Sequence, residues 1–145
     1  MKIRMLIKNK SVTNYDLGRK HYNDAGIDVY ALEDIELKAF ETIKVPLGFG
    51  IELPDGYMGL VLPRSSLAAK GIISHSAPID SGYNGEIHAI LTATTLIDGL
   101  SSYQIKKGDR IAQLVIQPIV LSDLILESNW EFNERNNGAF GSTGK

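Results

Sequence analysis

Short runs in which apolar residues recur at every second position are the feature that most constrains how this chain can fold. Ile3, Met5 and Ile7 alternate in this way near the N-terminus, and the longest such runs cover 86–97 and 110–120. A period of two is typical of a β-strand that buries one face. Further alternating runs contain Ile27 and Val29; Phe49, Ile51 and Leu53; and Met58, Leu60 and Leu62.

Turn-forming residues separate these runs. Gly, Asp, Asn, Ser and Pro cluster at 53–57, 80–86, 97–102 and 106–110, and these residues favour tight turns. Many short strands with regular turns, together with 14 glycines, predict an all-β domain with a closed or double-sheet architecture such as a jelly roll. One short helix is predicted around 65–71, where a serine can cap the N-terminus and Ala-Ala-Lys favours helix.

Length and patterning indicate a single β domain followed by an arm. The 145 residues suit one domain with a substantial core, and no repeat or linker interrupts the pattern before about residue 128. We therefore assign 1–128 to the β domain and 129–145 to a C-terminal arm. The composition of this arm predicts that it is flexible, because its Gly, Asn, Ser and Thr residues cannot build a core.

Composition excludes several functional classes. The chain has no cysteine, which removes disulfides and thiolate metal sites. Its apolar runs fall short of the ~20 residues of a membrane span, and the charged start MKIRMLIKNK is unlike a signal peptide. We therefore expect a soluble, cytoplasmic protein. The net charge of −2, with both signs interspersed, argues against binding nucleic acid, whereas a small anionic ligand needs only a few cations.

The end of the chain, ERNNGAFGSTGK (134–145), carries groups that suit an anion: flexible backbone N–H groups, hydroxyls and a guanidinium. A P-loop is excluded, because its spacing would require a first glycine at the position of Ala139, and because no Ser or Thr follows Lys145. The segment therefore needs another explanation.

Five polar stretches along the chain supply one when they are taken together. Each alone reads as a turn, a helix cap or a hairpin. In order they are AGIDVYA (25–31), PRSSLAAKG (63–71), APIDSGYNGE (77–86), KGDRIAQLVI (107–116) and RNNGAFGSTG (135–144). As a set they resemble the five ordered motifs of the trimeric dUTPase family. The resemblance implies a distorted jelly-roll β-barrel with one short helix, and a homotrimer with three active sites at the subunit interfaces. It also implies that the C-terminal arm closes over a site built by its neighbours.

The reaction that the resemblance implies is hydrolysis of dUTP to dUMP and pyrophosphate, by attack of water on the α-phosphorus. Asp80 matches the motif-three aspartate that positions and deprotonates this water. Ala77, Pro78 and Ile79 would form the wall of the uracil pocket, where backbone groups pair with the base. Tyr83 matches the tyrosine that packs under deoxyribose and leaves no room for a 2′-hydroxyl.

The resemblance spreads phosphate and metal binding over several segments. Mg²⁺ would arrive with the substrate and bind mainly phosphate oxygens and water. Asp28 resembles the motif-one aspartate, which we place near the water shell of the metal or in an ion pair with Arg64. The three histidines lack zinc spacing. The residues expected to bind substrate are Arg64, Ser65, Ser66 and Gln113 in the β domain, and Arg135, Phe140, Gly141, Ser142 and Thr143 in the arm, with Phe140 stacking on uracil.

Some positions depart from the common family pattern. Gly82 stands where a second acid is frequent, Asn136 and Ala139 stand where glycines are usual, and SHSAP (74–78) replaces a glycine-rich approach to the hairpin. None of these changes removes the base, the serines or the arginines.

Two alternatives follow from the same motifs. A dCTP deaminase resembles this family in fold and shares Arg-Ser-Ser, but its reaction requires a glutamate further along the strand after the hairpin. Here 87–97 contains no acid, and Glu86 comes directly after the turn glycine. The other alternative is a nucleotide-binding regulatory module of the same fold. A regulatory protein partner is also compatible with a catalytic role.

Overall fold

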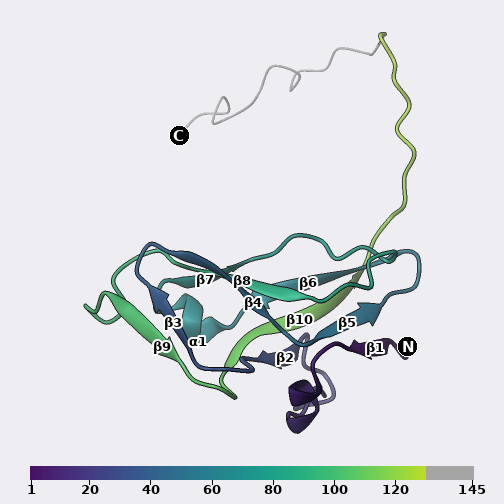
Figure 1. Cartoon of the computed structure of the whole chain (residues 1–145). Coiled ribbons are helices and arrows are strands. Elements are labelled where there is room, and N and C mark those ends of the chain that lie inside the picture. Colours follow the sequence, from purple (N-terminus) through teal and green to yellow (C-terminus); the bar gives the residue numbers. More distant parts are fainter. Residues whose placement is uncertain (130–145) are drawn as a thin grey trace.

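A computed structural model describes residues 1–129 of the chain, and its regular structure is dominated by strands (Figure 1). Besides the strands it contains the 3-10 helix η1 (Lys10–Asn14) and the α-helix α1 (Ser65–Ala68). The strands are β1 (Arg4–Ile7), β2 (Ile27–Tyr30), β3 (Ile35–Lys38), β4 (Thr42–Pro46), β5 (Phe49–Glu52), β6 (Tyr57–Pro63), β7 (Ile72–His75), β8 (His88–Ala93), β9 (Ser102–Ile105) and β10 (Arg110–Pro118). The prediction of an all-β fold with a short helix is confirmed.

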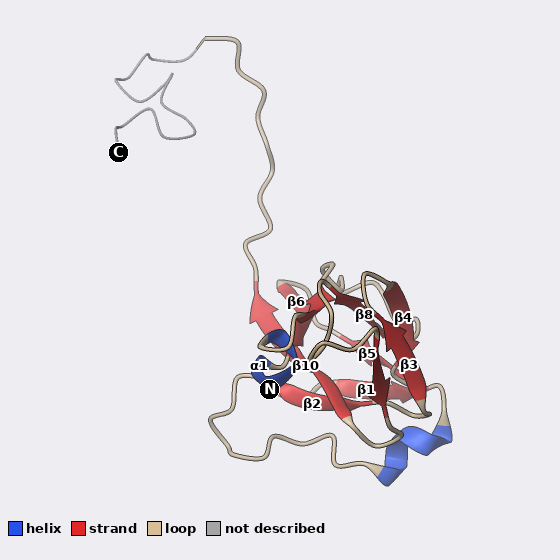
Figure 2. Cartoon of the chain, turned by 90° about the vertical axis from the view of Figure 1, so that its left-hand side faces the viewer, coloured by secondary structure: helices blue, strands red, loops and turns tan. Residues whose placement is uncertain are grey.

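The strands pair antiparallel in four small sheets. The orders are β1-β5, β2-β10-β6, β3-β9 and β4-β8-β7. Most neighbours within a sheet lie far apart in the sequence, as with β2 and β10, so the sheets wrap around one interior (Figure 2). A strand can bury one face inside such a barrel only if its apolar residues alternate, which is the pattern in the sequence.

The core consists of the inward-facing residues of these strands. In β8, Ala89, Leu91 and Ala93 are buried while the residues between them are more exposed. Phe49 is the largest side chain among those fully removed from solvent. Each buried Leu, Ile or Phe stabilises the fold by about 1.5–3 kcal/mol, so the alternation provides most of the drive for closing the barrel.

Local details differ from the sequence prediction. The strand containing Leu60 is present, but its fully buried positions are Gly59 and Val61, while Met58 and Leu60 lie on the half-exposed face. The helix ends earlier than expected, at Ala68, and the serine cap is wrong: Arg64 occupies the N-cap position without a side-chain cap.

Four strands and the 3-10 helix were not predicted. In β3, β4 and β9 apolar residues do recur at every second position, as with Ile35 and Leu37 in β3, so this signal was available. In β7 the two apolar residues are adjacent, and only its pairing with β8 identifies it as a strand. The 3-10 helix begins where the side chain of Asn9 accepts a hydrogen bond from the Ser11 amide at 2.9 Å, which satisfies a free N–H group at the helix start.

After β10 the chain leaves the barrel in an extended conformation up to residue 129 (Figures 1 and 2). Large apolar residues of this stretch are almost wholly exposed in the single chain: Val120, Leu121, Leu124, Ile125 and Leu126. The flexible arm assigned to 129–145 lies outside the described residues except for its first residue. None of the helices in the described part of the chain is long and apolar enough to cross a membrane.

Candidate functional site in two pockets

The first pocket gathers the residues expected to bind the base and activate water. Ala77, Pro78, Ile79, Asp80 and Tyr83 line one cavity of about 270 Å³. They all come from the segment that joins β7 to β8, so these residues are close to one another in the sequence. The cavity itself is a product of packing, because its other lining residues include Val61 of β6 and Ile90 of β8.

Hydrogen bonds to β6 hold this segment in place. The Ile79 amide donates to the Gly59 carbonyl at 2.8 Å, and the Gly59 amide donates to the Ile79 carbonyl at 2.9 Å. Nearby, the Val61 amide donates to the Ser76 hydroxyl at 3.0 Å. The wall at 77–79 is therefore attached to β6, the edge strand of the β2-β10-β6 sheet, and is not a free loop.

Asp80 opens a tight turn at the rim of this cavity. The Tyr83 amide donates to the Asp80 carbonyl at 3.0 Å, so main-chain atoms close the turn. The Asp80 side chain is exposed, and within residues 1–129 its carboxylate has no ion-pair partner. An exposed carboxylate beside an apolar cavity can accept a hydrogen bond from water.

Tyr83 folds back over the hairpin. Its hydroxyl donates to the Glu86 carbonyl at 3.0 Å, and a Cβ added to Gly85 would lie 2.5 Å from the Tyr83 hydroxyl. Only glycine at position 85 therefore leaves space for this ring. His88 Nδ1 lies 3.2 Å from the same carbonyl, and a carbonyl can only accept, so Nδ1 is the donor.

Glu86 has a structural task that the sequence did not indicate. Its Oε1 atom accepts a hydrogen bond from the Gly48 amide at 2.9 Å, in the turn between β4 and β5. The carboxylate thus anchors the hairpin to a neighbouring turn, although it also borders the first pocket.

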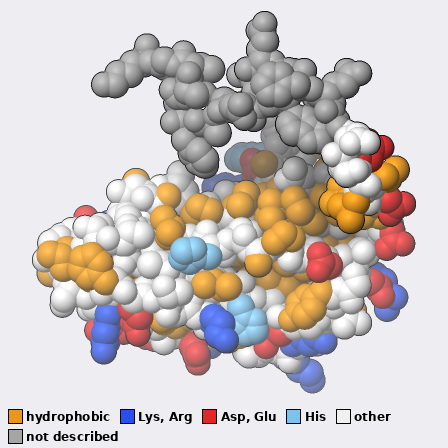
Figure 3. Space-filling view, turned by 90° about the horizontal axis from the view of Figure 1, so that it is seen from above, with side chains coloured by type: hydrophobic (Ala, Val, Ile, Leu, Met, Phe, Trp, Pro, Cys, Tyr) orange, Lys and Arg blue, Asp and Glu red, His pale blue; other side chains and the backbone are white. Residues whose placement is uncertain are grey.

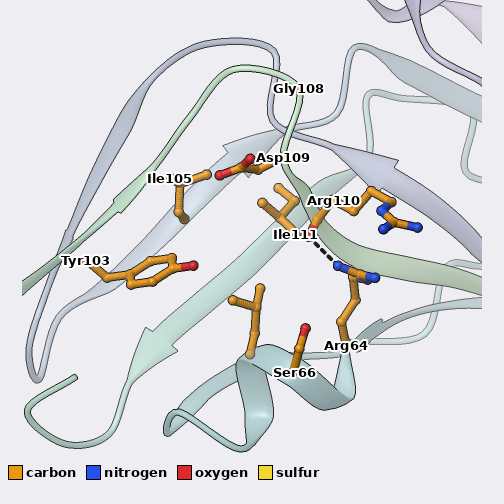
Figure 4. A pocket seen from close by; sticks show the side chains of 9 residues that line it. Arg64, Ser66, Tyr103, Ile105, Gly108, Asp109, Arg110 and Ile111 are labelled. Carbon is orange, nitrogen blue, oxygen red and sulfur yellow. Dashed lines mark hydrogen bonds between the residues drawn. The ribbon is translucent and has the colours of Figure 1, made fainter. Parts of the chain in front are cut away.

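The second pocket holds cationic and hydroxyl groups (Figure 4). Its volume is about 280 Å³, and Arg64 and Ser66 reach it from the start of α1 while Asp109 and Arg110 reach it from the start of β10. Tyr103 lies on its other side in the close-up. Of the two serines expected to bind phosphate, Ser66 lines this pocket and Ser65 is outside its lining.

Asp28 on β2 bridges two arginines beside this pocket. Its Oδ1 atom lies 3.3 Å from Arg64 Nε, and its Oδ2 atom lies 3.1 Å from Arg110 Nη1. The expected pairing of Asp28 with Arg64 is therefore present. Arg110 was not anticipated as a site residue, although its place directly after the GD turn and three residues before Gln113 was a usable signal.

Gln113 lies opposite Asp28 in the pairing of β10 with β2. Its Nε2 atom donates to the Pro63 carbonyl at 3.2 Å, immediately before Arg64. A Cβ on Gly26 would lie 2.6 Å from Gln113 Oε1, so glycine at that position allows the amide to sit where it does. The first, second and fourth sequence motifs thus meet at one place in the fold.

A tyrosine pair borders the two arginines. The rings of Tyr15 and Tyr30 stack with centroids 4.8 Å apart, and the Tyr30 hydroxyl donates to the Asp16 carbonyl at 3.1 Å. Burial, followed by the negative charge of Asp28, raises the pKa of Tyr30 above its ordinary value. The phenol therefore stays protonated and keeps its donor role at neutral and moderately basic pH.

The two pockets share no lining residue. One subunit therefore presents the expected base site and the expected phosphate site separately. Arg135, Phe140, Gly141, Ser142 and Thr143 of the arm lie outside the described residues. Within residues 1–129, no group of three or more His, Asp or Glu side chains is arranged to hold a metal ion.

The surface charge agrees with the sequence composition. The face seen from above in Figure 3 carries many hydrophobic side chains with histidines among them, and acidic and basic side chains lie both within this face and along its edge. The described part of this face thus presents mixed charge.

Comparison with known proteins gives a consistent result. A family model described as dUTPase matches residues 15–144. The deoxyuridine 5'-triphosphate nucleotidohydrolase of Paramecium bursaria Chlorella virus 1 is 46% identical over 121 residues, which cover 83% of each chain. The protein of the same name from Clostridium tetani (strain Massachusetts / E88) is 35% identical over 148 residues, covering 100% of this chain and 97% of its own.

A solved structure shares the same overall fold. The dUTPase of Staphylococcus bacteriophage 80alpha, determined with dUpNHpp, superimposes with a TM-score of 0.84 at 28% identity and covers 99% of both chains. The jelly-roll architecture expected from the motifs is confirmed by this similarity.

Proposed function

This chain belongs to the dUTPase family, and we propose that it hydrolyses dUTP to dUMP and pyrophosphate by attack of water on the α-phosphorus. The observation that carries the assignment of residues is the clustering of 77–80 and Tyr83 around one cavity, with a second, arginine-containing pocket elsewhere on the same subunit. A nucleoside triphosphate has an uncharged end and a highly charged end, and the two pockets match these ends in chemical character.

Asp80 is the residue that we assign to the attacking water. A carboxylate in water is a weak base compared with the groups usually employed for proton abstraction at neutral pH. The exposed carboxylate of Asp80 therefore acts mainly by orienting the water and by accepting its proton as the bond to phosphorus forms. The pyrophosphate leaves from the opposite side of the phosphorus.

Recognition of the nucleoside is assigned to the rest of the first pocket. Ala77, Pro78 and Ile79 supply the wall. Both backbone groups of Ile79 are bonded to Gly59 and Pro78 has only a carbonyl, so the proposed backbone partners of uracil are the amide and carbonyl of Ala77 and the carbonyl of Pro78. Close apolar walls disfavour the extra methyl group of thymine, although a steric filter alone discriminates only modestly. Tyr83, pinned through its hydroxyl to the Glu86 carbonyl, packs under deoxyribose and disfavours a 2′-hydroxyl.

The triphosphate is assigned to the second pocket and to the arm. Charge stabilisation is the main requirement of phosphoryl transfer, and guanidinium groups supply it with fixed geometry. In the arm, Phe140 would stack on the base. The proposed phosphate ligands are Arg64, Ser65, Ser66 and Gln113 from the β domain, with Arg135, Gly141, Ser142 and Thr143 from the arm.

Mg²⁺ is the proposed cofactor, and it would neutralise part of the charge that develops on the phosphates. The lack of a ligand cluster within residues 1–129 fits an ion that binds mainly phosphate oxygens and water. The protein group that we assign to the metal is Asp28, which would act through a water molecule. Arg64 and Arg110 already contact both of its oxygens.

A homotrimer with interfacial active sites is the assembly that we propose. In this assembly the first pocket of one subunit would lie beside the second pocket of another, which fits the finding that the two pockets of one chain share no lining residue. The exposed apolar stretch that follows β10 suits burial on a neighbouring subunit, and the arm of 129–145 would then reach a site that it did not build.

Location, the rival reaction and further partners complete the proposal. We place the protein in the cytoplasm, where the absence of cysteine has no structural cost. A deaminase is disfavoured by the comparisons and by Glu86, whose carboxylate binds the Gly48 amide. A regulatory protein partner stays a prediction.

The decisive experiment is pyrophosphate release with Mg²⁺ from dUTP, dTTP, UTP and dCTP. We expect selective cleavage of dUTP by the full chain, and loss of most activity when the chain ends at Glu134. Asp80→Asn should lower kcat by about 10²–10⁴-fold, whereas Asp98→Asn, an exposed control at which asparagine suits the positive φ of 51°, should leave kcat unchanged. Intact dUTP after incubation with folded full-length protein would refute the proposal.

A further inference from the structure

We propose that Arg110 is a positioning residue for the triphosphate, acting through Asp28 to hold Arg64 in its binding orientation. The inference rests on the proposed phosphate role of Arg64. In this arrangement the main role of Asp28 is to bind the two guanidinium groups. The effect of Asp28 on nucleotide binding therefore does not require a metal ion.

The geometry around Asp28 leaves neither carboxylate oxygen unengaged. Oδ1 lies 3.3 Å from Arg64 Nε, and Oδ2 lies 3.1 Å from Arg110 Nη1. The side chains of Asp28 and Arg64 are 26% and 27% exposed, and that of Arg110 is 41% exposed. The pair of Asp28 with Arg64 is therefore screened less by solvent and salt than a surface pair, and Arg110 binds Asp28 from the more exposed edge of the cluster.

Arg64 is held at a second point as well. Its Nη1 atom donates to the main-chain carbonyl of Arg110 at 3.2 Å (Figure 4). A guanidinium is planar and presents its donors in a rigid fork, so contacts at Nε and at Nη1 fix the plane of the whole group. The two N–H donors of Nη2 and the second N–H of Nη1 are then left for an anion in the pocket that Arg64 and Ser66 line.

Arg110 binds the carboxylate oxygen of Asp28 that Arg64 does not contact. Without its positive charge, Asp28 would have one partner and its carboxylate could rotate about Arg64. Because the carbonyl contact belongs to the main chain, a substitution of the Arg110 side chain removes only the ion pair. The contribution of the side chain can therefore be measured separately from the carbonyl contact.

The direction in which nucleotide affinity changes when Asp28 is replaced distinguishes a positioning role from a purely electrostatic one. Asp28→Asn removes a negative charge next to a proposed phosphate site, and electrostatics alone would then tighten anion binding. If Asp28 positions the arginines, the same substitution weakens binding. If Asp28 instead serves the water shell of Mg²⁺, the weakening appears only when Mg²⁺ is present.

The test is calorimetric titration of dUpNHpp into the assembled protein, with EDTA and separately with Mg²⁺, for wild type, Arg110→Gln, Asp28→Asn and the double variant. Each single substitution should weaken binding about tenfold, the order expected for one charged hydrogen bond, in both buffers. The double variant should be about as weak as Asp28→Asn alone, because groups that act through one another are not additive. Arg110→Lys should restore part of the affinity.

Controls separate this inference from a folding defect and from the wider proposal. Arg4→Gln removes an exposed arginine that pairs with Glu52 and should bind like wild type, and every variant is compared by thermal melting. Three outcomes would overturn the inference: unchanged binding by Arg110→Gln, full additivity in the double variant, or an Asp28→Asn defect seen only with Mg²⁺. In each case the wild type would still cleave dUTP, so the proposed function would be unaffected. A wild type that neither binds dUpNHpp nor cleaves dUTP would instead overturn the proposed function.

Discussion

At the scale of single residues, glycine positions determine where two expected site residues lie. Gly26 makes room for Gln113, and Gly85 makes room for the ring of Tyr83. Gly82 lies in the same hairpin as Gly85, but a Cβ added there would meet nothing within 4 Å. The hairpin therefore supplies its own matched control for the effect of one added methyl group.

Gly26→Ala should weaken phosphate binding. The new Cβ would lie 2.6 Å from Gln113 Oε1 and 3.0 Å from Gln113 Cβ, so the amide must move away from Pro63 and from Asp28 opposite it. We expect KM for dUTP to rise about tenfold, the cost of one hydrogen bond to a charged group, with a smaller change in kcat. Steady-state kinetics will show this, and an unchanged KM would mean that Gln113 does not bind substrate.

Gly85→Ala should loosen sugar selection. The added Cβ would lie 2.5 Å from the Tyr83 hydroxyl, which forces the ring off the Glu86 carbonyl. The ratio of kcat/KM for dUTP over UTP should fall about tenfold, within the range for a changed steric fit, and Gly82→Ala should keep the wild-type ratio. Equal ratios in all three proteins would remove Tyr83 from sugar recognition.

At the scale of elements, one carboxylate holds the turn between β9 and β10, which leads into Arg110. Asp34 Oδ1 accepts from the Lys107 amide at 2.8 Å, and Oδ2 lies 3.4 Å from Lys106 Nζ. The amide hydrogen bond, helped by the nearby lysines, lowers the pKa of Asp34 below its ordinary value. The turn is thus stabilised by a charged acceptor that lies just before β3, the strand that pairs with β9.

The pH dependence of this contact has a defined sign. Because the folded-state pKa of Asp34 lies below the unfolded value, its stabilising contribution is present above the unfolded pKa and is lost as pH falls through the folded pKa. Asp34→Ala should therefore lower the melting temperature at pH 7, and the difference from wild type should shrink below about pH 3.9, the ordinary aspartate pKa. Thermal melts from pH 7 to pH 3 check this, with Glu33→Ala as the control; a difference that does not vary with pH would contradict it.

At the scale of the whole molecule, the chain leaves a large apolar surface uncovered. Leu124 is 91% exposed and Leu126 is 98% exposed in the single chain, in a stretch that extends away from the barrel (Figure 1). Burial of one leucine is worth about 1.5–3 kcal/mol. A surface of this kind is typical of a segment that packs on another subunit.

Leu124→Asp should therefore weaken assembly without unfolding the barrel. We expect sedimentation velocity to show a trimer for wild type and smaller species for the variant at micromolar concentration. Leu100→Asp, at an exposed leucine in a different loop, should remain trimeric. A wild type that sediments as a monomer with full dUTP cleavage would contradict interfacial active sites.

The sequence predicted the residues of the first pocket better than the contacts around the second pocket. The hairpin residues from Ala77 to Tyr83 are neighbours in sequence, so their motif already indicated one pocket. The contact of Asp28 with Arg110 joins β2 to β10 across a ladder, and no local pattern indicates such a pairing. The place of Arg110 beside the GD turn marked it as a candidate, but its pairing with Asp28 could not be predicted. The contact of Glu86 with Gly48 could not be predicted either, because it reaches into a turn that the motifs do not include.

The sequence by itself determined the all-β class, the order of the five motifs and the chemical type of each expected site residue. These are local properties, since alternation, turn chemistry and motif spacing are readable over a few residues at a time. Only the tertiary structure decided which face of β6 is buried, that Asp28 lies between two arginines, and that the two pockets of one chain are separate. Those features depend on which distant strands pair and in what register, and that choice is made by the packing of the whole barrel.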